Sequence, residues 1–442
     1  MELPQAFINR IKHQFNDAGE FLEALKQPAV TSIRNHPVKK YISDLSLAEK
    51  IEWCESAFYL KERPVFTLDP SFHAGAYYVQ ESSSMFLWTV LEQLFDDKNI
   101  RILDLCAAPG GKSTLIASWL NGEGLLVSNE VIKPRAKILL ENITKWGYSN
   151  TWVTNTDAYV LGGLPEFFDA VVIDAPCSGE GLFRKDAGAI EEWSQSNCDL
   201  CSSRQRKILA EIIPSVKEGG YVIYSTCTYN PEENDENVKW LLEKFPFEVV
   251  TLNVISYKEA TLTNNGGVAF YPHKTQGEGF YCCILRKTGE VESNDIRKQK
   301  QVFSSYNSKQ INLDDFVTQP FLWLQKGDEI IGINEDLKDE FKIISEVTKI
   351  TGGYLHPGEI KGNSLIPSHA LAMSIYATGF EKIALDKDQS LHFLAKRDFK
   401  LPQSSNGWLL ADYNDLPLGF LKNLGNRFNN YYPMDWRIRM DF

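Results

Sequence analysis

Two cysteines in polar, turn-forming surroundings are the residues of this chain best suited to chemistry. Cys177 lies in the segment DAPCSG (174–179), and Cys227 lies in the segment STCTY (225–229). A single buried cysteine is most often a small apolar residue, so neither would indicate a site by itself. Each, however, follows an apolar, strand-like segment, and neighbouring parallel strands end at one edge of a sheet. We therefore expect both thiols to face one crevice.

The segment RILDLCAAPGGK (101–112) predicts a short strand, a loop of small residues and the start of a helix. Such a loop lets the backbone approach a ligand closely, and the free N–H groups at the helix start face that ligand. Cys106 stands where the Walker A motif needs a glycine, and the three spaced glycines of the dinucleotide fingerprint are absent. The loop therefore indicates a nucleoside ligand without a pyrophosphate, with S-adenosylmethionine as the candidate.

Strand-like and helix-like segments alternate from residue 101 to residue 287, which predicts a parallel sheet covered by helices on both faces. The last strand follows its predecessor without a helix between them, so it should enter antiparallel. The expected strands are 102–105, 125–128, 152–154, 168–173, 221–224 and 279–285, and the expected helices include 134–146, 204–216 and one starting at 230–233.

Acidic residues follow several of these strands, at the edge where open α/β sheets bind ligands. Glu130 comes about twenty residues after the small-residue loop, where an acid usually accepts hydrogen bonds from ribose hydroxyls. Asp157 is placed to reach the adenine, and Asp174 precedes Cys177. Glu130 or Asp157 alone is also compatible with an ordinary strand end. Together the three acids mark the same edge of the sheet as the two thiols.

A thiol beside a methyl donor suggests methylation of a pyrimidine at carbon 5, which is too weakly nucleophilic to react unaided. A thiolate that adds to carbon 6 turns the ring into an enamine, whose carbon 5 can attack a sulfonium methyl group. Asp174 is placed to stabilise this adduct by hydrogen bonding to the ring edge. A base must then remove the carbon-5 proton, and Cys177, or a water that it positions, is the candidate. These arguments do not decide which cysteine is the nucleophile.

At these residues the chain resembles the Nop/Sun (Fmu-like) RNA cytosine carbon-5 methyltransferases. Five ordered motifs between about residues 70 and 287 carry the resemblance: YYVQESSSM (77–85), LDLCAAPGGK (103–112), DAPCSGEG (174–181), STCTY (225–229) and PHKTQGEGFY (272–281). The tail resembles the bacterial ribosomal small-subunit methyltransferase F subgroup through GEIKG (358–362), PSHALA (367–372), PLGFLK (417–422) and YYPMDWR (431–437).

The resemblance implies a role for each matching residue. Cys227 would be the nucleophile and Cys177 would assist release, whereas the methyltransferases that act on DNA use the cysteine of a Pro-Cys motif, here Cys177. Asp174 would be shared between the cytosine and the cofactor. The residues implied to line S-adenosylmethionine are Cys106, Ala107, Ala108, Pro109, Gly110, Gly111, Lys112, Glu130, Asp157 and Asp174.

The expected fold is α/β, with a Rossmann-like class I methyltransferase sheet as its largest part. Residues 1–70 should form a small α-rich, RNA-contacting domain, because apolar residues recur there at helical spacing. Residues 71–287 would be the methyltransferase domain, 288–301 a polar linker and 302–382 an intermediate α+β domain. The subgroup resemblance implies that residues 383–442 form a PUA-like RNA-binding β-barrel.

Basic residues gather in two places outside the central domain. Arg34, Lys39 and Lys40 surround Pro37, and they suit a solvated face or phosphate contacts equally well. Near the C-terminus the basic residues Lys422, Arg427, Arg437 and Arg439 alternate with the aromatic residues Phe420, Phe428, Tyr431, Tyr432 and Trp436. That pattern is typical of single-stranded nucleic-acid binding, and equally of a barrel core with a solvated rim.

Composition sets bounds on the class of protein. The chain has 442 residues, 43% of them hydrophobic and 24% charged, which is ordinary for a globular protein of two or three domains. Its net charge of −12 argues only mildly against a nucleic-acid partner, because local patches decide binding. We expect a soluble cytoplasmic protein without a membrane partner or a metal. Cys198 and Cys201 form a lone CxxC that suits packing better than zinc.

The sequence therefore predicts an S-adenosylmethionine-dependent RNA methyltransferase that forms 5-methylcytosine, with 16S ribosomal RNA as the expected substrate. Three alternatives remain at this point. The first is a transfer-RNA substrate for the same chemistry. The second is a catalytically silent RNA-binding ribosome assembly factor, against which the presence of Asp174 and both cysteines argues. The third is a P-loop nucleotide hydrolase, which Cys106 disfavours.

Overall fold

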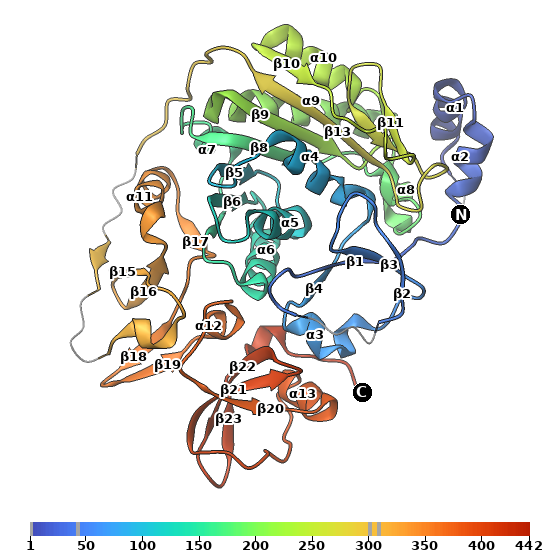
Figure 1. Cartoon of the computed structure of the whole chain (residues 1–442). Coiled ribbons are helices and arrows are strands. Elements are labelled where there is room, and N and C mark those ends of the chain that lie inside the picture. Colours follow the sequence, from blue (N-terminus) through green and yellow to red (C-terminus); the bar gives the residue numbers. More distant parts are fainter. Residues whose placement is uncertain (1–2, 41–44, 299–302, 307–310) are drawn as a thin grey trace.

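The computed structural model describes residues 3–40, 45–298, 303–306 and 311–442 (Figure 1). A large central domain carries the predicted sheet. The N-terminal part of the chain lies along one side of this domain, and residues 303–382 lie on the opposite side. The C-terminal domain, red in Figure 1, lies below the central domain and next to the short helix α3 (Pro70–His73).

A mixed sheet, ten-stranded within the described residues, forms the centre of the molecule. Its parallel part has the order β9-β8-β5-β6-β7, and the last strand, β13, pairs antiparallel with β9. All five predicted parallel strands and the antiparallel entry of the last strand are thus confirmed. The bounds are β5 Arg101–Asp104, β6 Leu125–Asn129, β7 Thr151–Thr154, β8 Phe168–Asp174, β9 Val216–Thr226, β10 Phe247–Val250, β11 Ala260–Leu262, β12 Val268–Phe270 and β13 Phe280–Lys287.

Helices cover both faces of this sheet. Successive strand residues such as Ile102 and Leu103 point to opposite faces, and both are fully buried, so each face packs against helices. The helices α4 (Leu87–Leu94), α5 (Gly111–Leu120) and α6 (Lys133–Trp146) pack on the face of Ile102. The helices on the face of Leu103 are α7 (Ala158–Leu161), α9 (Gln195–Ile212) and α10 (Asp235–Lys244).

Two predicted helix bounds are wrong. The helix expected at 204–216 begins earlier, at Gln195, because the Ser194 hydroxyl caps it by accepting a hydrogen bond from Asn197 N at 3.2 Å. The helix expected to begin at 230–233 begins only at Asp235. There the Asn230 side chain accepts a hydrogen bond from Glu232 N at 2.9 Å, which holds the segment as a turn.

The N-terminal segment is helical only at its start. Helices α1 (Gln5–Gln14) and α2 (Ala18–Ala24) confirm the first part of the prediction, but a four-stranded antiparallel sheet follows. The prediction of a helical domain up to residue 70 is wrong for this sheet, whose strands are too short to show an alternating pattern. The strand order is β2-β3-β1-β4, with β1 Ser32–Asn35, β2 Leu47–Lys50, β3 Ala57–Leu60 and β4 Tyr77–Val79.

The basic cluster around Pro37 is largely buried. Arg34 is 0% exposed and donates hydrogen bonds to Gln80 Oε1 at 3.1 Å and to Thr114 Oγ1 at 2.7 Å. Lys39 is also buried, its Nζ donates to Ala74 O, and burial lowers the pKa of its ammonium group to about 7. Both expectations, a solvated face and phosphate contacts, are therefore wrong for Arg34 and Lys39.

Residues 303–382 extend the central domain and do not stand apart from it. Strand β17 pairs antiparallel with β7 at the edge of the sheet, and Phe341 of α11 packs in the core beside Leu103 and Val127. The other elements contribute two small hairpin sheets. The bounds are β14 Ser304–Ser305, β15 Leu322–Lys326, β16 Glu329–Ile333, α11 Lys338–Val347, β17 Ile350–Gly352, β18 Gly358–Lys361, β19 Ser364–Pro367 and α12 His369–Met373.

The predicted linker over 288–301 also packs on the central domain. Asn294 Nδ2 donates a hydrogen bond to Glu211 O at 2.8 Å, and Ile296 packs against the core. A free linker is therefore the wrong description of residues 288–298. The remaining linker residues, 299–301, lie outside the described part of the chain.

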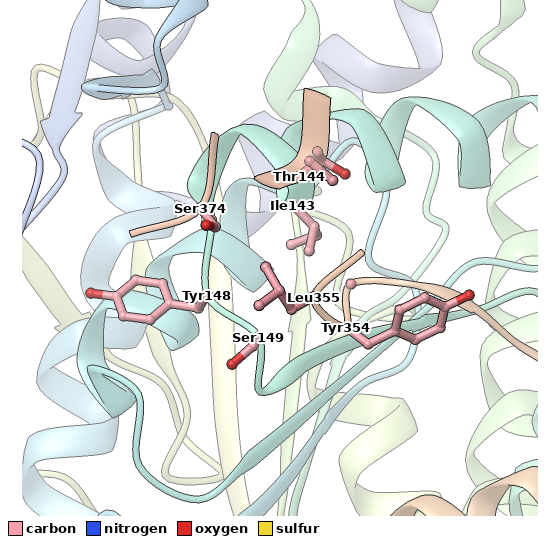
Figure 2. A pocket seen from close by; sticks show the side chains of 10 residues that line it. Ile143, Thr144, Tyr148, Ser149, Tyr354, Leu355 and Ser374 are labelled. Atoms are coloured by element: carbon pink, nitrogen blue, oxygen red, sulfur yellow. The ribbon is translucent and has the colours of Figure 1, made fainter. Parts of the chain in front are cut away.

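Figure 2 shows the contact between the end of α6 and residues 353–374. A hollow of about 20 Å³ lies there between Ile143, Tyr148, Tyr354 and Leu355. That volume holds about one water molecule, so the hollow is a packing feature of the contact and not a ligand site. The backbone bond from Ile375 N to Gly147 O, at 3.2 Å, closes the same contact.

The C-terminal domain is a four-stranded sheet with one helix, and it shares a core with the N-terminal sheet. Leu409 and Leu421 are fully buried in a cluster that also contains Leu60 and Tyr77. In the aromatic and basic segment, Phe420 and Tyr432 belong to the core, as a barrel interior would require. The bounds are β20 Glu381–Ala384, α13 Lys387–Leu394, β21 Gly407–Tyr413, β22 Leu416–Asn423 and β23 Phe428–Asn430.

Candidate active site

The two cysteines meet at the carboxyl ends of β8 and β9. Cys177 Sγ lies 3.2 Å from Cys227 Sγ, so the structure brings the two thiols into contact. Gly181 N donates a hydrogen bond to Cys227 O at 2.7 Å, and a Cβ at position 181 would lie 2.5 Å from that oxygen. A glycine is therefore required where the segment carrying Cys177 crosses the segment carrying Cys227.

A lysine–carboxylate pair lies next to the thiols. Lys112 Nζ lies 2.8 Å from Asp174 Oδ2, and Ser225 Oγ donates a hydrogen bond to Asp174 Oδ1 at 3.2 Å. Burial lowers the pKa of Lys112, but the carboxylates of Asp174 and Asp104 outweigh it and leave this pKa raised. The pair thus places a fixed positive charge and an acceptor beside the two sulfur atoms.

The thiol of Cys177 is held in its protonated form. Its hydrogen bond with Cys227, followed by its burial, raises the pKa of Cys177 well above the ordinary value. Either sulfur can donate the hydrogen bond that joins them. A proton on one sulfur and an acceptor on the other is the arrangement that a thiolate nucleophile needs beside an acid.

A buried carboxylate behind Cys177 was not expected from the sequence. Glu233 is 0% exposed, and its Oε2 accepts hydrogen bonds from Ser178 N and from Gln205 Nε2, both at 2.9 Å. Gln205 Nε2 also donates to Pro176 O at 3.0 Å. Burial raises the pKa of Glu233 to about 7. Glu233 thus fixes the backbone on both sides of Cys177. The sequence did not indicate this role, because it depends on the turn at 230–234, where a helix start was expected.

A cavity of about 550 Å³ lies beside the ends of β5, β6 and β7, and its walls include Cys106, Glu130, Asp157 and Pro176. Three predicted cofactor residues therefore share one cavity, and Pro176 connects it to the segment that carries Cys177. The sequence did not point to Arg135, which also lines this cavity and whose Nη2 donates a hydrogen bond to Ala108 O at 2.8 Å. The sequence feature that could have indicated Arg135 is its position in the first, exposed turn of α6.

The small-residue loop is held by α5 and α6. Gly110 has a φ of +115°, and α5 begins at Gly111. Asn142 Nδ2 donates a hydrogen bond to Pro109 O at 2.8 Å, which holds the loop against α6. Below the loop, burial raises the pKa of Asp104 to about 7, and Ser113 Oγ donates to Asp104 Oδ2 at 2.6 Å. Ala107 and Ala108 are buried between the sheet and α6.

The residues present suit a nucleoside methyl donor. Glu130 is 2% exposed, and its Oε1 accepts a hydrogen bond from Ile132 N at 2.9 Å. Within the described residues its Oε2 makes no hydrogen bond and lies 3.3 Å from Arg135 Nη1. A buried carboxylate oxygen beside an open cavity is the acceptor that ribose hydroxyls require. No group of three or more His, Cys, Asp and Glu side chains within the described residues has a metal-binding arrangement.

The fold and the site together define a Rossmann-like methyltransferase. Family models place the chain within that class. The model "16S rRNA methyltransferase RsmB/F" matches residues 90–286, the model of the N-terminal domain of 16S rRNA methyltransferase RsmF matches residues 3–82, and the RsmF PUA-domain model matches residues 380–438.

Relatives of similar length agree with these models. "Ribosomal RNA small subunit methyltransferase F" of Erwinia tasmaniensis is 31% identical over 98% of this chain and 96% of its own length. The protein of the same name from Vibrio vulnificus (strain YJ016) is 30% identical over 98% of this chain and 97% of its own length. The chain therefore belongs to the family of ribosomal RNA small subunit methyltransferase F, and it is an S-adenosylmethionine-dependent methyltransferase.

Solved structures share the fold of the central domain. A methyltransferase homolog protein from Pyrococcus horikoshii is 26% identical, with a TM-score of 0.53, over 62% of this chain and 91% of that one. NSun6 from the same organism, solved with SFG, has a TM-score of 0.56 at 22% identity over 65% of this chain and 99% of that one. No helix within the described residues is long and apolar enough to span a bilayer.

Proposed function

We propose that this chain forms 5-methylcytosine in the RNA of the small ribosomal subunit, with Cys227 as nucleophile and Cys177 as the residue that assists release. The observation that carries the proposal is the 3.2 Å contact between the two sulfur atoms beside the Lys112–Asp174 pair. The names of the family and of its relatives supply the ribosomal RNA substrate.

The proposed reaction begins with Cys227, whose thiolate adds to carbon 6 of the cytosine and turns carbon 5 into an enamine carbon. The Cys177 S–H and the Lys112 ammonium stabilise the thiolate beforehand. Asp174 accepts a hydrogen bond from the amino edge of the ring and so holds the base. S-adenosylmethionine, when bound, supplies the methyl group. A water that Cys177 positions then takes the proton from carbon 5. The bond from carbon 6 to sulfur breaks, its electron pair returns to Cys227, and the ring becomes aromatic again.

The family resemblance gives this order of roles. The raised pKa of Cys177 agrees with it, because a raised pKa disfavours a thiolate at that sulfur. The opposite order, which the Pro-Cys motif of DNA methyltransferases suggests, would require such a thiolate at Cys177.

The cofactor half of the proposal assigns Glu130 to the ribose hydroxyls and Asp157 to the adenine. Both lie in the cavity of about 550 Å³, together with Cys106 of the small-residue loop. Asp174 is assigned to both halves, because it ends β8, which lies between β5, the strand before that loop, and β9, the strand before Cys227.

The test is transfer of labelled methyl groups from S-adenosylmethionine to RNA by the purified chain. We expect methylation of naked 16S ribosomal RNA or assembled small subunits, mapped by bisulfite sequencing to one or a few cytidines. Methylation of transfer RNA alone would replace the ribosomal substrate with the first alternative. A wild-type chain that binds RNA but transfers no methyl group would favour the silent assembly factor. A ribosomal RNA substrate also implies that the protein acts in the cytoplasm.

The N-terminal and C-terminal domains are proposed to contact RNA. The match of residues 380–438 to a PUA-domain model supports this for the C-terminal domain. The exposed side chains of Arg427, Tyr431 and Arg439 are available for such contacts.

A further inference from the structure

A second cleft opens beside the active site, between the N-terminal sheet and the central domain. It has a volume of about 470 Å³, in the range of roughly 300–1,000 Å³ typical of ligand pockets. Its lining consists of residues 29–32 and Arg63, of Arg184 and Lys185 (the wall), and of residues 79–81 (the floor).

The wall of this cleft is continuous with the segment that carries the cysteines. Arg184 follows Cys177 in the same loop, and its Nε lies 2.6 Å from Glu278 Oε2, with both side chains only 4% exposed. Between the two, Gly181 N is bonded to Cys227 O. This wall is therefore joined to Cys177 through one short segment of chain.

The floor of the cleft is rigid and adjoins the cofactor loop. The Glu81 carboxylate accepts hydrogen bonds from Ser83 N, Ser84 N and Glu278 N at 2.8–2.9 Å, so backbone donors satisfy its oxygens while its negative charge remains. A Cβ at Gly111 would lie 3.6 Å from the Gln80 side chain, which places this floor next to the start of α5.

The cleft is positively charged although the chain as a whole carries −12. Arg184 is paired with Glu278, and the Lys185 ammonium lies 3.6 Å from the other oxygen of the same carboxylate, with its side chain 34% exposed. One carboxylate thus faces two cations. Within the described residues Arg63 forms no ion pair, and its guanidinium lies 5.5 Å from the Phe66 ring centroid. Arg63 and Lys185 are the exposed cations of this lining.

We propose that this cleft holds the sugar–phosphate backbone of the RNA nucleotides adjacent to the target cytosine, with Arg63 and Lys185 contacting phosphates. A groove lined by cations is the arrangement by which proteins track the backbone of a single strand. Val30 and Val79, which also line the cleft, offer apolar surface to a ribose or a base. This inference rests on the proposed function, because it assumes an RNA substrate.

The test compares the double variant Arg63→Gln/Lys185→Gln with the control Lys338→Gln/Lys342→Gln. The control removes the same charge from the exposed side of α11, away from the cleft. For the first pair we expect the KM for RNA to rise roughly five- to thirtyfold at an unchanged kcat. The affinity for S-adenosylmethionine should not change. The slope of log affinity against log salt should fall by about 1.4, since each single-strand phosphate contact contributes about 0.7.

Several outcomes would overturn the proposal. One is an RNA KM and a salt slope equal to those of the control, and another is a loss confined to kcat. A loss seen with intact small subunits but not with naked RNA would mean that the cleft holds a ribosomal protein. If the double variant does not fold, Lys185→Gln alone is measured, since it leaves the Arg184–Glu278 pair in place. If the wild-type chain bound RNA without methylating it, the proposed function would be refuted. Titrations of RNA binding by wild type and variant would still test whether the cleft holds RNA.

Discussion

At the carboxyl edge of the central sheet, the proposed cofactor half and the proposed cytosine half are built differently. At the ends of β5 and β6, side chains are held by the backbone: Asn129 Nδ2 donates to Leu105 O at 3.1 Å, and Glu130 accepts from Ile132 N. At the ends of β8 and β9, titratable side chains contact one another: Cys177 with Cys227, and Lys112 with Asp174.

The difference follows from what each half must do. A group that only binds gains from rigid partners, because nothing about it changes during the reaction. A group that gives or takes a proton needs a neighbour whose charge can change with it. The cofactor half should therefore tolerate substitution with a loss of affinity, whereas the cytosine half should lose rate.

The largest effect is expected from Cys227→Ala. Without the sulfur that adds to carbon 6 the reaction has no route, so methylation should fall about ten-thousandfold or more while S-adenosylmethionine still binds. Methyl transfer and cofactor titration measure the two quantities. The control is Cys201→Ala, a buried cysteine of α9 outside the site. Residual activity within tenfold of wild type would contradict the assignment.

Cys177→Ala should stop the reaction at a later point. If Cys177 assists release, the variant accumulates a covalent protein–RNA adduct that survives denaturant, visible as a shifted band in gel electrophoresis. The double substitution Cys177→Ala/Cys227→Ala serves as the control and should give no adduct. An adduct in Cys227→Ala, with none in Cys177→Ala, would reverse the two roles.

Asp174→Asn tests the group that borders both halves. The neutral amide removes the negative charge that pairs with Lys112. We therefore expect the rate at saturating cofactor to fall roughly a hundred- to a thousandfold. The affinity for S-adenosylmethionine should fall less. Asp169→Asn is a matched control, because Asp169 lies in the same strand toward its other end and pairs with Lys217. Equal losses in both variants would indicate a structural effect.

Glu130→Gln should act on binding alone. Removing the charged acceptor weakens hydrogen bonds to ribose, which corresponds to a rise of about ten- to a hundredfold in the Kd for S-adenosylmethionine. The kcat at saturating cofactor should stay near that of wild type. Glu243→Gln, an exposed residue of α10, is the control. If Glu130→Gln instead lowered kcat and left the Kd unchanged, the distinction between a cofactor half that binds and a cytosine half that reacts would be contradicted.

The smallest effect concerns stability against pH. Burial raises the pKa of Glu233 to about 7, above its ordinary 4.5, so its ionisation is unfavourable in the folded state. Stability should be highest below pH 4.5 for this group and should fall as the pH rises toward 7, by about 1–3 kcal/mol. Asp104 acts in the same direction.

Thermal unfolding at pH 5 and pH 7.5 measures this fall. In Glu233→Gln the decrease in midpoint should be smaller than in wild type, because the amide does not ionise. The exposed Glu236→Gln should leave the decrease unchanged. An equal decrease in wild type and Glu233→Gln would show that other groups cause it.

Much of the central domain could be read from local patterns. The five parallel strands are apolar runs bounded by turn residues. When a helix separates one such run from the following run, few structures other than a buried parallel strand fit the run. The N-terminal sheet was missed, because strands of three or four residues carry no clear alternation and are set by pairing, as between Ile33 and Val79. The pairing of β17 with β7 was missed for the same reason.

By itself, the sequence determined which residue types stand at the strand ends, because motif spacing places Cys177, Cys227, Asp174 and Glu130 after predicted strands. Only the tertiary structure decided what surrounds them. It buried Arg34 and Lys39, put Glu233 behind Cys177 and opened the cleft that Arg63 and Lys185 line. Burial and charge depend on segments far apart in the chain, and a local pattern carries no information about which of those segments will meet.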